Sequence, residues 1–141
     1  MMGPTNDLFK SPLKRPETGL KIVRIAIGLI ISVHALRGLL IPANTNGFGG
    51  YLGSLGFPFG VGLAWLIVIL QFGSCLGLIF CRLVVLSCIC NLAILMVGIG
   101  LIHIQSGWFV VGEGRNGMEY SVTLMACLFA ILWAYWPSRH S

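Results

Sequence analysis

Charged side chains are almost absent from the hundred residues between Gly38 and Pro137. That stretch contains only four: Arg82, Glu113, Arg115 and Glu119. They divide the apolar sequence into segments of about 20 residues, the length that crosses a membrane as a helix. A water-soluble domain needs a charged surface and carries about 25% charged residues, whereas this chain has 9%. The sequence therefore predicts an integral membrane protein, in which each polar residue needs an explanation.

Four apolar segments predict an all-α fold, a four-helix transmembrane bundle. We expect the spans at about residues 20–41, 58–81, 83–103 and 119–136. Together they form one membrane domain, residues 20–136, flanked by cytoplasmic tails at 1–19 and 137–141. Pro42 and the following polar run, Asn44 to Gly47, should end the first span, and Arg82 marks a very tight turn.

The segment between the first two spans, about residues 47–57, is too short and too rich in glycine to cross a membrane. Phe48, Tyr51, Leu52 and Leu55 repeat at the i, i+3, i+4, i+7 spacing of an amphipathic helix. This pattern predicts a short interfacial helix with its apolar face in the lipid.

Lys and Arg residues are distributed unequally, and the imbalance predicts the orientation. Five of the nine lie between Lys10 and Arg24, and Arg82 and Arg139 fall on the same side of a four-span arrangement. The positive side is cytoplasmic, so we expect a multi-pass protein of the cell (inner) membrane with both termini inside. The net charge of +5 thus reflects membrane orientation and does not indicate a nucleic-acid partner.

A cleaved signal peptide is the alternative for the first apolar segment. His34 and Arg37 interrupt that segment, and the basic tail before it is long for such a leader. We therefore treat the segment as a span.

Ionisable side chains gather near the outer ends of three predicted spans. Arg37 lies about one turn inside the first span, His103 ends the third and Glu119 begins the fourth, with His34 one turn deeper than Arg37. Intramembrane ionisable groups normally face the bundle interior and pair, so we expect an Arg37–Glu119 ion pair with His103 nearby. The functional interpretation is a ligand pocket open to the outer leaflet. In the structural alternative, Glu119 favours a helix N-terminus, Arg37 snorkels and His103 touches headgroups.

Two amides, Gln71 and Asn91, lie near the middle of the second and third spans. Gln71 is a candidate ligand contact, but both amides could simply bond across helices. Gly73 and Gly77 form a small-xxx-small pattern, which we assign, with Gly98 and Gly100, to packing inside the bundle.

Five cysteines could indicate redox chemistry, but none forms a Cys-x-x-Cys pair. We interpret them as small apolar residues of packed helices; they are Cys75, Cys81, Cys88, Cys90 and Cys127. The chain also shows no metal-ligand spacing, because His34 and His103 lie on different helices without accompanying carboxylates.

Over about residues 20–136 the chain resembles the DoxX family of small four-span membrane proteins, which includes the DoxD-like small subunit of thiosulfate:quinone oxidoreductase. The matching pieces, in chain order, are Arg24 with Ile27-Gly28-Leu29, Gly47 to Pro58 ending in Leu-Gly-Phe-Pro, Gln71 with Leu76-Gly77, Cys81-Arg82, His103, Gly107 and Gly117-Met118-Glu119-Tyr120.

The resemblance implies a four-helix membrane bundle that sometimes works with soluble redox partners. By matching position, His103 and Glu119 look like retained polar positions of the family. Arg37 stands where the family often has Lys, and Gln71 where a Glu is common. That last difference removes a charge from the middle of the membrane and weakens any proton relay through the site.

The leading hypothesis is a redox-associated subunit of a quinone-linked oxidoreductase that binds quinone near the outer leaflet, with no covalently bound cofactor. Arg37 and His103 would hold the carbonyls, Glu119 would orient or exchange protons, and a membrane or soluble partner would supply electrons. The alternative is a non-enzymatic scaffold, assembly factor or lipid-binding protein that uses the same pocket. A transporter is a third hypothesis, which would need a homo-oligomer to make a pathway.

Overall fold

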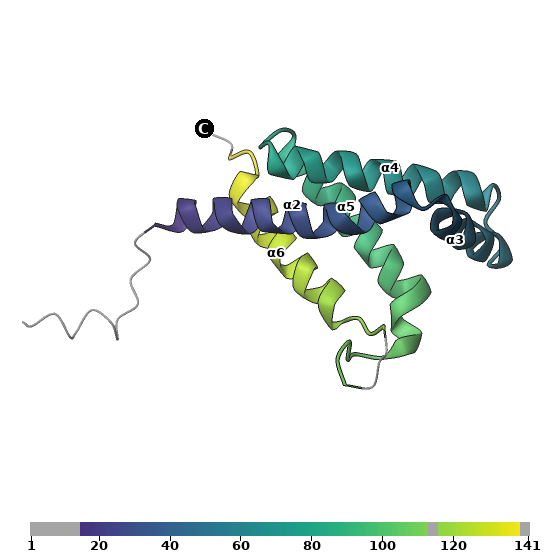
Figure 1. The fold of residues 1–141 in the computed structure, drawn as a ribbon. Coiled ribbons are helices and arrows are strands. Elements are labelled where there is room, and N and C mark those ends of the chain that lie inside the picture. Colours follow the sequence, from purple (N-terminus) through teal and green to yellow (C-terminus); the bar gives the residue numbers. More distant parts are fainter. Residues whose placement is uncertain (1–14, 113–115, 139–141) are drawn as a thin grey trace, which may run out of the picture.

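The computed structural model describes residues 15–112 and 116–138, and every regular element within them is helical (Figure 1). The elements are α2 (Pro16–Leu40), α3 (Pro42–Ser54), α4 (Gly60–Ile79), α5 (Val84–Gly98), the π-helical turn η2 (Ile99–His103), the 3-10 turn η3 (Ile104–Ser106) and α6 (Glu119–Tyr135). The predicted all-α bundle, with a short helix between the first two spans, is confirmed.

The helices carry their apolar side chains outward, as expected of a protein in lipid. Three helical stretches are long and apolar enough to cross a membrane: Pro16–Leu40, Gly60–Ile79 and Val84–Ser106. α6 is a fourth apolar helix of 17 residues, about 25 Å long. Val33 is 69% exposed, whereas Asn91 is completely buried. This inverted pattern identifies a multi-pass membrane protein.

The first helix begins earlier than expected. α2 starts at Pro16, four residues before the predicted start of the membrane domain. Proline fits the first helical turn, because its missing N–H would have no helical partner there and its φ is already close to the helical value. The predicted tail therefore loses its last residues to α2; residues 1–14 of that tail and 139–141 of the C-terminal tail lie outside the described residues.

The prediction that the first span ends before Pro42 is confirmed, since α2 ends at Leu40, but the run from Pro42 to Gly47 belongs to a second helix. A single residue, Ile41, separates α2 from α3, and Pro42 is the first residue of the new helix. The Thr45 hydroxyl, buried between the two helices, donates a 2.7 Å hydrogen bond to the Gly38 carbonyl. This bond satisfies a carbonyl at the end of α2 that has no intrahelical partner, so the direction of the chain changes without a loop.

Glycine allows α3 to fold back onto α4. A Cβ atom at Gly60 would lie 2.3 Å from the Gly49 carbonyl oxygen, and one at Gly49 would lie 2.4 Å from the Val61 Cα. No side chain fits at such distances, so the two helix backbones touch directly. α3 is thereby fixed beside the start of α4, at the right of Figure 1.

The tight turn predicted at Arg82 is confirmed, since α4 ends at Ile79 and α5 begins at Val84. Gly77 packs against this turn, where an added Cβ would lie 2.3 Å from the Ser87 hydroxyl. The packing role predicted for the other three glycines is wrong, because an added Cβ would meet nothing within 4 Å at any of them: Gly73, Gly98 and Gly100.

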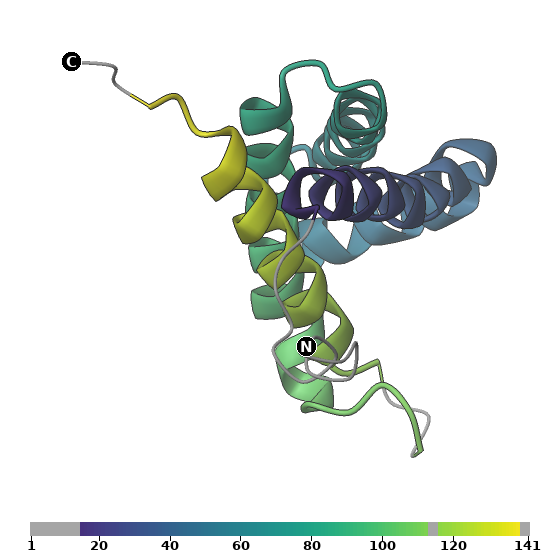
Figure 2. The same ribbon diagram turned by 90° about the vertical axis from the view of Figure 1, so that its left-hand side faces the viewer.

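The spanning helices form two layers that diverge toward one end. α2 and α4 run side by side and pack most extensively on each other, while α5 and α6 cross them obliquely (Figures 1 and 2). We call the end with Arg24, the turn at 80–83 and Tyr135 the closed end, and the end with α3 and residues 104–112 and 116–118 the open end. The layers are together at the closed end and apart at the open end.

The hydrophobic core occupies the closed half of the bundle. Its buried residues come from all four spanning helices: Ile27, Ile31, Cys75, Leu78, Val84, Cys88, Leu92, Leu124, Leu128 and Ile131. The cysteines Cys75 and Cys88 are thus core residues, and all five cysteines are free thiols. Among the residues that the structure describes, the open half has no comparable core, which leaves room for a cavity there.

A buried arginine joins three helices at the closed end. Arg24 is 5% exposed, and its Nη1 donates to the carbonyls of Leu78 and Ile79, the latter at 3.3 Å, at the end of α4. The guanidinium also lies over the ring of Tyr135 in α6, 6.0 Å from its centroid. A cation at a helix C-terminus satisfies unpaired carbonyls and interacts favourably with the helix dipole. Arg24 therefore holds α2, α4 and α6 together.

Candidate functional site

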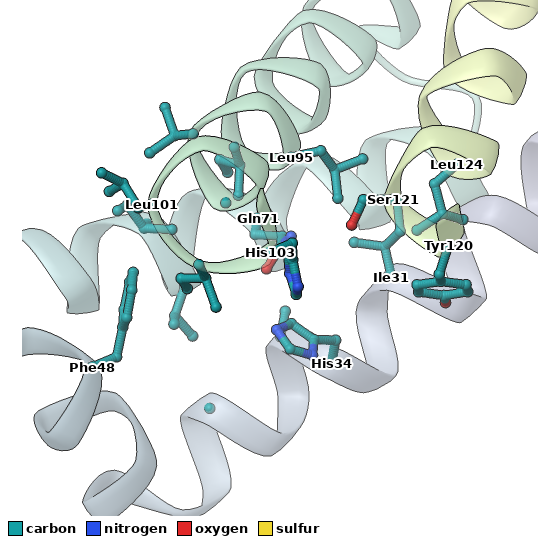
Figure 3. Close-up of a pocket in the computed structure, with 18 of the residues that line it drawn as sticks. Ile31, His34, Phe48, Gln71, Leu95, Leu101, His103, Tyr120, Ser121 and Leu124 are labelled. Carbon is teal, nitrogen blue, oxygen red and sulfur yellow. The ribbon is translucent and has the colours of Figure 1, made fainter. Parts of the chain in front are cut away.

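A cavity of about 750 Å³ opens between the two layers at the open end. Its walls are mostly apolar and come from every spanning helix and from α3 (Figure 3). The polar side chains on its walls are His34, Arg37, Asn44, Thr45, Gln71, His103, Asn116, Tyr120 and Ser121. The bundle thus has an apolar chamber with a small number of polar groups, the usual composition of a small-molecule site.

Four of the five predicted site residues line this cavity: His34, Arg37, Gln71 and His103. They come from α2, α4 and η2, so side chains far apart in the sequence are brought to one chamber. The rings of His34 and His103 point toward each other across it (Figure 3). The expected convergence of polar groups from separate helices is therefore present for these four.

Glu119 is the exception, because it is not among the described residues of the cavity wall. Its Oε1 accepts a 3.0 Å hydrogen bond from the Val110 backbone N–H, and its own N–H donates to the Trp108 carbonyl. The expected Arg37–Glu119 ion pair is absent from the described part of the chain. Glu119 is the first residue of α6, and helical side chains point back toward the N-terminus, so its carboxylate meets the preceding loop.

His103 owes its position to the π-helical turn. A π turn adds one residue to the helix and so rotates the side chains that follow. The Nδ1 atom of His103 lies 2.8 Å from the Asn116 carbonyl oxygen. Since a carbonyl only accepts, Nδ1 carries the proton, and Nε2 of the neutral ring is an acceptor. Protonation would turn Nε2 into a donor, so His103 can serve either a hydroxyl or a carbonyl.

The two central amides have different environments. Asn91 Nδ2 donates to the Ser74 hydroxyl at 2.7 Å and to the Ser87 carbonyl at 2.9 Å. This confirms that Asn91 bonds across helices, between α4 and α5. Gln71 is 6% exposed and lines the cavity, yet its side-chain amide has no hydrogen-bond partner among the residues that the structure describes. Its polar atoms are available to a ligand.

Several wall residues were not predicted from the sequence. Thr45 and Phe48 come from α3, which is therefore part of the site. Tyr51 of α3 donates a 2.8 Å hydrogen bond to the Leu101 carbonyl, which ties α3 to the π-helical turn. Ser121 of α6 lies in the wall and is 5% exposed. Ser121 could have been found from the sequence, because it is a polar residue in an apolar helix. The prediction chose its neighbour Glu119 instead.

The described residues contain no group of three or more His, Cys, Asp or Glu side chains that could hold a metal ion. Comparisons with protein-family models, curated proteins and solved structures gave no match for this chain. The resemblance to the DoxX family therefore stays a prediction, and the site is interpreted from its own chemistry.

Proposed function

We propose that this protein binds a quinone, or a ring of similar size and polarity, in the cavity at the open end, as a membrane subunit associated with a redox reaction. The observation that carries the proposal is the cavity itself, about 750 Å³ between four apolar helices. Small-molecule sites have volumes of roughly 300–1,000 Å³, apolar walls and a few convergent polar groups. A quinone ring with its apolar substituents has matching chemistry.

The hydrogen-bond donors on the wall favour a ligand with hydrogen-bond acceptors. Arg37 and His34 offer N–H donors, and neither side chain has a hydrogen-bond or ion-pair partner among the described residues. No Asp or Glu is among the described wall residues. A cationic ligand would lack a counter-charge here, whereas the oxygen of a carbonyl would receive donors.

His103 supports the redox aspect of the proposal. Its Nε2 can accept from the hydroxyl of a reduced ring, or donate to the carbonyl of an oxidised ring once it is protonated. A group with this ability suits a ring that gains or loses protons with its electrons. The electrons would come from a membrane or soluble partner, as the resemblance to the DoxX family implies.

The predicted orientation completes the proposal. Both termini would lie in the cytoplasm, and the cavity would open within the outer leaflet of the cell membrane. A ligand dissolved in the bilayer would then reach the site laterally, without crossing water.

The test is extraction and mass spectrometry of small molecules from protein purified in mild detergent. We expect stoichiometric quinone in the wild type and roughly tenfold less in Gly98→Leu, because Gly98 lines the cavity and its new side chain would occupy ligand space. Gly73→Leu is the matched control, since Gly73 also has open space beside it but is not part of the wall.

Two results would count against quinone binding. One is a wild type that holds only bulk phospholipid, in amounts that Gly98→Leu does not change. The other is equal quinone retention by the two glycine variants. Either result would favour the scaffold or lipid-binding alternative.

A further inference from the structure

Four consecutive apolar residues are exposed between the third span and α6. They are Trp108, Phe109, Val110 and Val111. Phe109 is 67% exposed and Val111 is 80% exposed. In Figures 1 and 2 this segment lies beside the start of α6, at the open end. We call residues 107–111 the apolar loop. A contiguous exposed apolar surface marks a site of contact with lipid or with another protein.

The backbone of the apolar loop is paired with the start of α6. The Met118 N–H donates to the Gly107 carbonyl at 3.1 Å. The Glu119 N–H donates to the Trp108 carbonyl at 3.0 Å, and the Glu119 carboxylate accepts from the Val110 N–H at 3.0 Å. The first N–H groups of a helix have no helical partner, and water can satisfy them where the helix begins in solvent. Here the protein satisfies two of these N–H groups itself, as a helix that begins in contact with lipid requires.

Gly117 fixes the apolar loop against α6. A Cβ atom at Gly117 would lie 2.3 Å from the Phe109 carbonyl oxygen and 2.5 Å from the Trp108 carbonyl oxygen. No side chain fits at such distances, so the two backbone segments touch directly. The loop is therefore held through its backbone, while the side chains of Phe109 and Val111 stay exposed.

α6 is too short to cross a bilayer by itself. Its 17 residues give a length of about 25 Å, roughly 5 Å less than the hydrocarbon core of a bilayer. The apolar loop lies beside the first residues of α6, so it extends the apolar surface of this helix at the open end. Lipid at this level would thus meet apolar side chains over the missing length.

The polar groups of the same region limit how deep the loop can lie. The Glu119 side chain is only half-buried, and a carboxylate is unfavourable within the hydrocarbon core. Trp108 has an amphipathic ring of the kind that is enriched where lipid meets water. Both residues therefore favour the boundary between the hydrocarbon and the headgroups.

We propose that the apolar loop inserts into the leaflet at the open end, with Phe109 and Val111 among the lipid chains and with Trp108 and Glu119 at the level of the headgroups. The partner of this surface is the phospholipid of that leaflet. Val110 also lines the cavity, so the loop places part of the rim of the cavity in lipid. The inference goes beyond the proposed function and does not depend on which ligand the cavity binds.

The test is the depth of a spin label attached at residue 111 after Val111→Cys, in full-length protein reconstituted into phosphatidylcholine vesicles. Collisions of the label with oxygen, which concentrates in the bilayer, are compared with collisions with a nickel chelate, which stays in water. The label is attached in a background whose incompletely buried cysteines are replaced by alanine: Cys81, Cys90 and Cys127.

Two matched labels calibrate the depth. Val33→Cys places a label on the apolar surface of α2, where Val33 is 69% exposed. Glu17→Cys places one at an exposed charged residue in the first turn of the same helix. We expect the label at residue 111 to collide mainly with oxygen, as at residue 33, and the label at residue 17 to collide mainly with the nickel chelate.

Two results would overturn the inference. Collisions with the nickel chelate at residue 111 as frequent as at residue 17 would show that the loop stands in water, as a surface for a protein partner would. Protection of residue 111 from both reagents would show that a second protein chain covers the loop. If Val111→Cys does not fold, the same measurement on Phe109→Cys decides. Quinone does not enter the readout, so failure here is distinguishable from failure of the proposed function.

Discussion

Arg24 and Asn91 are polar residues inside the bundle whose partners are part of the protein itself. The Arg24 guanidinium donates to carbonyls at the end of α4 and lies over the ring of Tyr135. The Asn91 amide donates to the Ser74 hydroxyl and to the Ser87 carbonyl. Gln71 and Ser121 are buried to a similar degree but have no such partners among the described residues. Burial alone therefore does not separate structural polar residues from candidate binding residues, and a structural residue need not have every polar atom paired, since the buried Arg24 Nε has no hydrogen-bond partner among the described residues.

Replacing Arg24 should weaken the closed end. We expect Arg24→Leu to lower the free energy of unfolding by about 2 kcal/mol, because charged hydrogen bonds to two α4 carbonyls are lost. Thermal unfolding in detergent measures the change. Lys21→Leu is the control, since Lys21 is an exposed residue one turn earlier on the same helix. Equal melting temperatures for the two variants would show that Arg24 does not hold the helices together.

Single-residue roles could be predicted from the sequence only in part. The interhelical role of Asn91 followed from its position in an apolar helix, and so did a polar cluster containing His34, Arg37 and His103. The environment of Glu119 could not be predicted from the sequence, because it depends on the path of the loop before α6. Arg24 was interpreted as an orienting charge, and its partners could not be foreseen without the packing of α4 against α2.

The elements are joined by features that hydropathy does not reveal. α3 packs on α4 backbone to backbone through Gly49 and Gly60. The third span ends in a π-helical turn at Ile99–His103, held to α3 by the Tyr51–Leu101 bond. α3 and the π turn both contribute residues to the cavity wall. The short helix is therefore a structural part of the site.

A methyl group at Gly60 should separate α3 from α4. We expect Gly60→Ala to destabilise the protein by about 2 kcal/mol, in the range of overpacked cores, because its Cβ would overlap the Gly49 carbonyl. Gly62→Ala, on the same helix, meets nothing within 4 Å and should be neutral or slightly stabilising. Chemical denaturation of both variants measures the difference. If Gly60→Ala is as stable as Gly62→Ala, direct backbone contact is not required.

The lengths and order of the helices were predictable because the apolar segments leave few alternatives. The starts of α2 and α3 were not, since Pro16 fell in the predicted tail and Pro42 was interpreted only as the end of the first span, whereas each begins a helix. The π turn was also missed. Its Leu101 carbonyl accepts a hydrogen bond from Tyr51 of α3, a tertiary contact that the local sequence pattern does not reveal.

For the whole molecule, the number of spans and the basic residues together set the topology. We expect a fluorescent protein fused to either terminus to fold in the cytoplasm, and alkaline phosphatase inserted in the loop at 104–118 to be active outside. The reason is the excess of Lys and Arg at the closed end, including Arg15, Lys21 and Arg82. Active phosphatase at the C-terminus would reverse the predicted orientation and place the cavity in the inner leaflet.

The arrangement of the two layers has a mechanical consequence. Arg24 contacts the Tyr135 ring across the layers at the closed end, and at the open end a hydrogen bond from Tyr51 to the Leu101 carbonyl joins them, so any widening of the cavity would have to stretch that bond. A tilt of about 5° would shift the far end of a helix of about 25 Å by roughly 2 Å, while the core near Arg24 would hardly change. Such a tilt would let the cavity bind ligands of different width with little change in the packing of the hydrophobic core. The closed end of the bundle would then keep its structure while the width of the cavity at the open end varies.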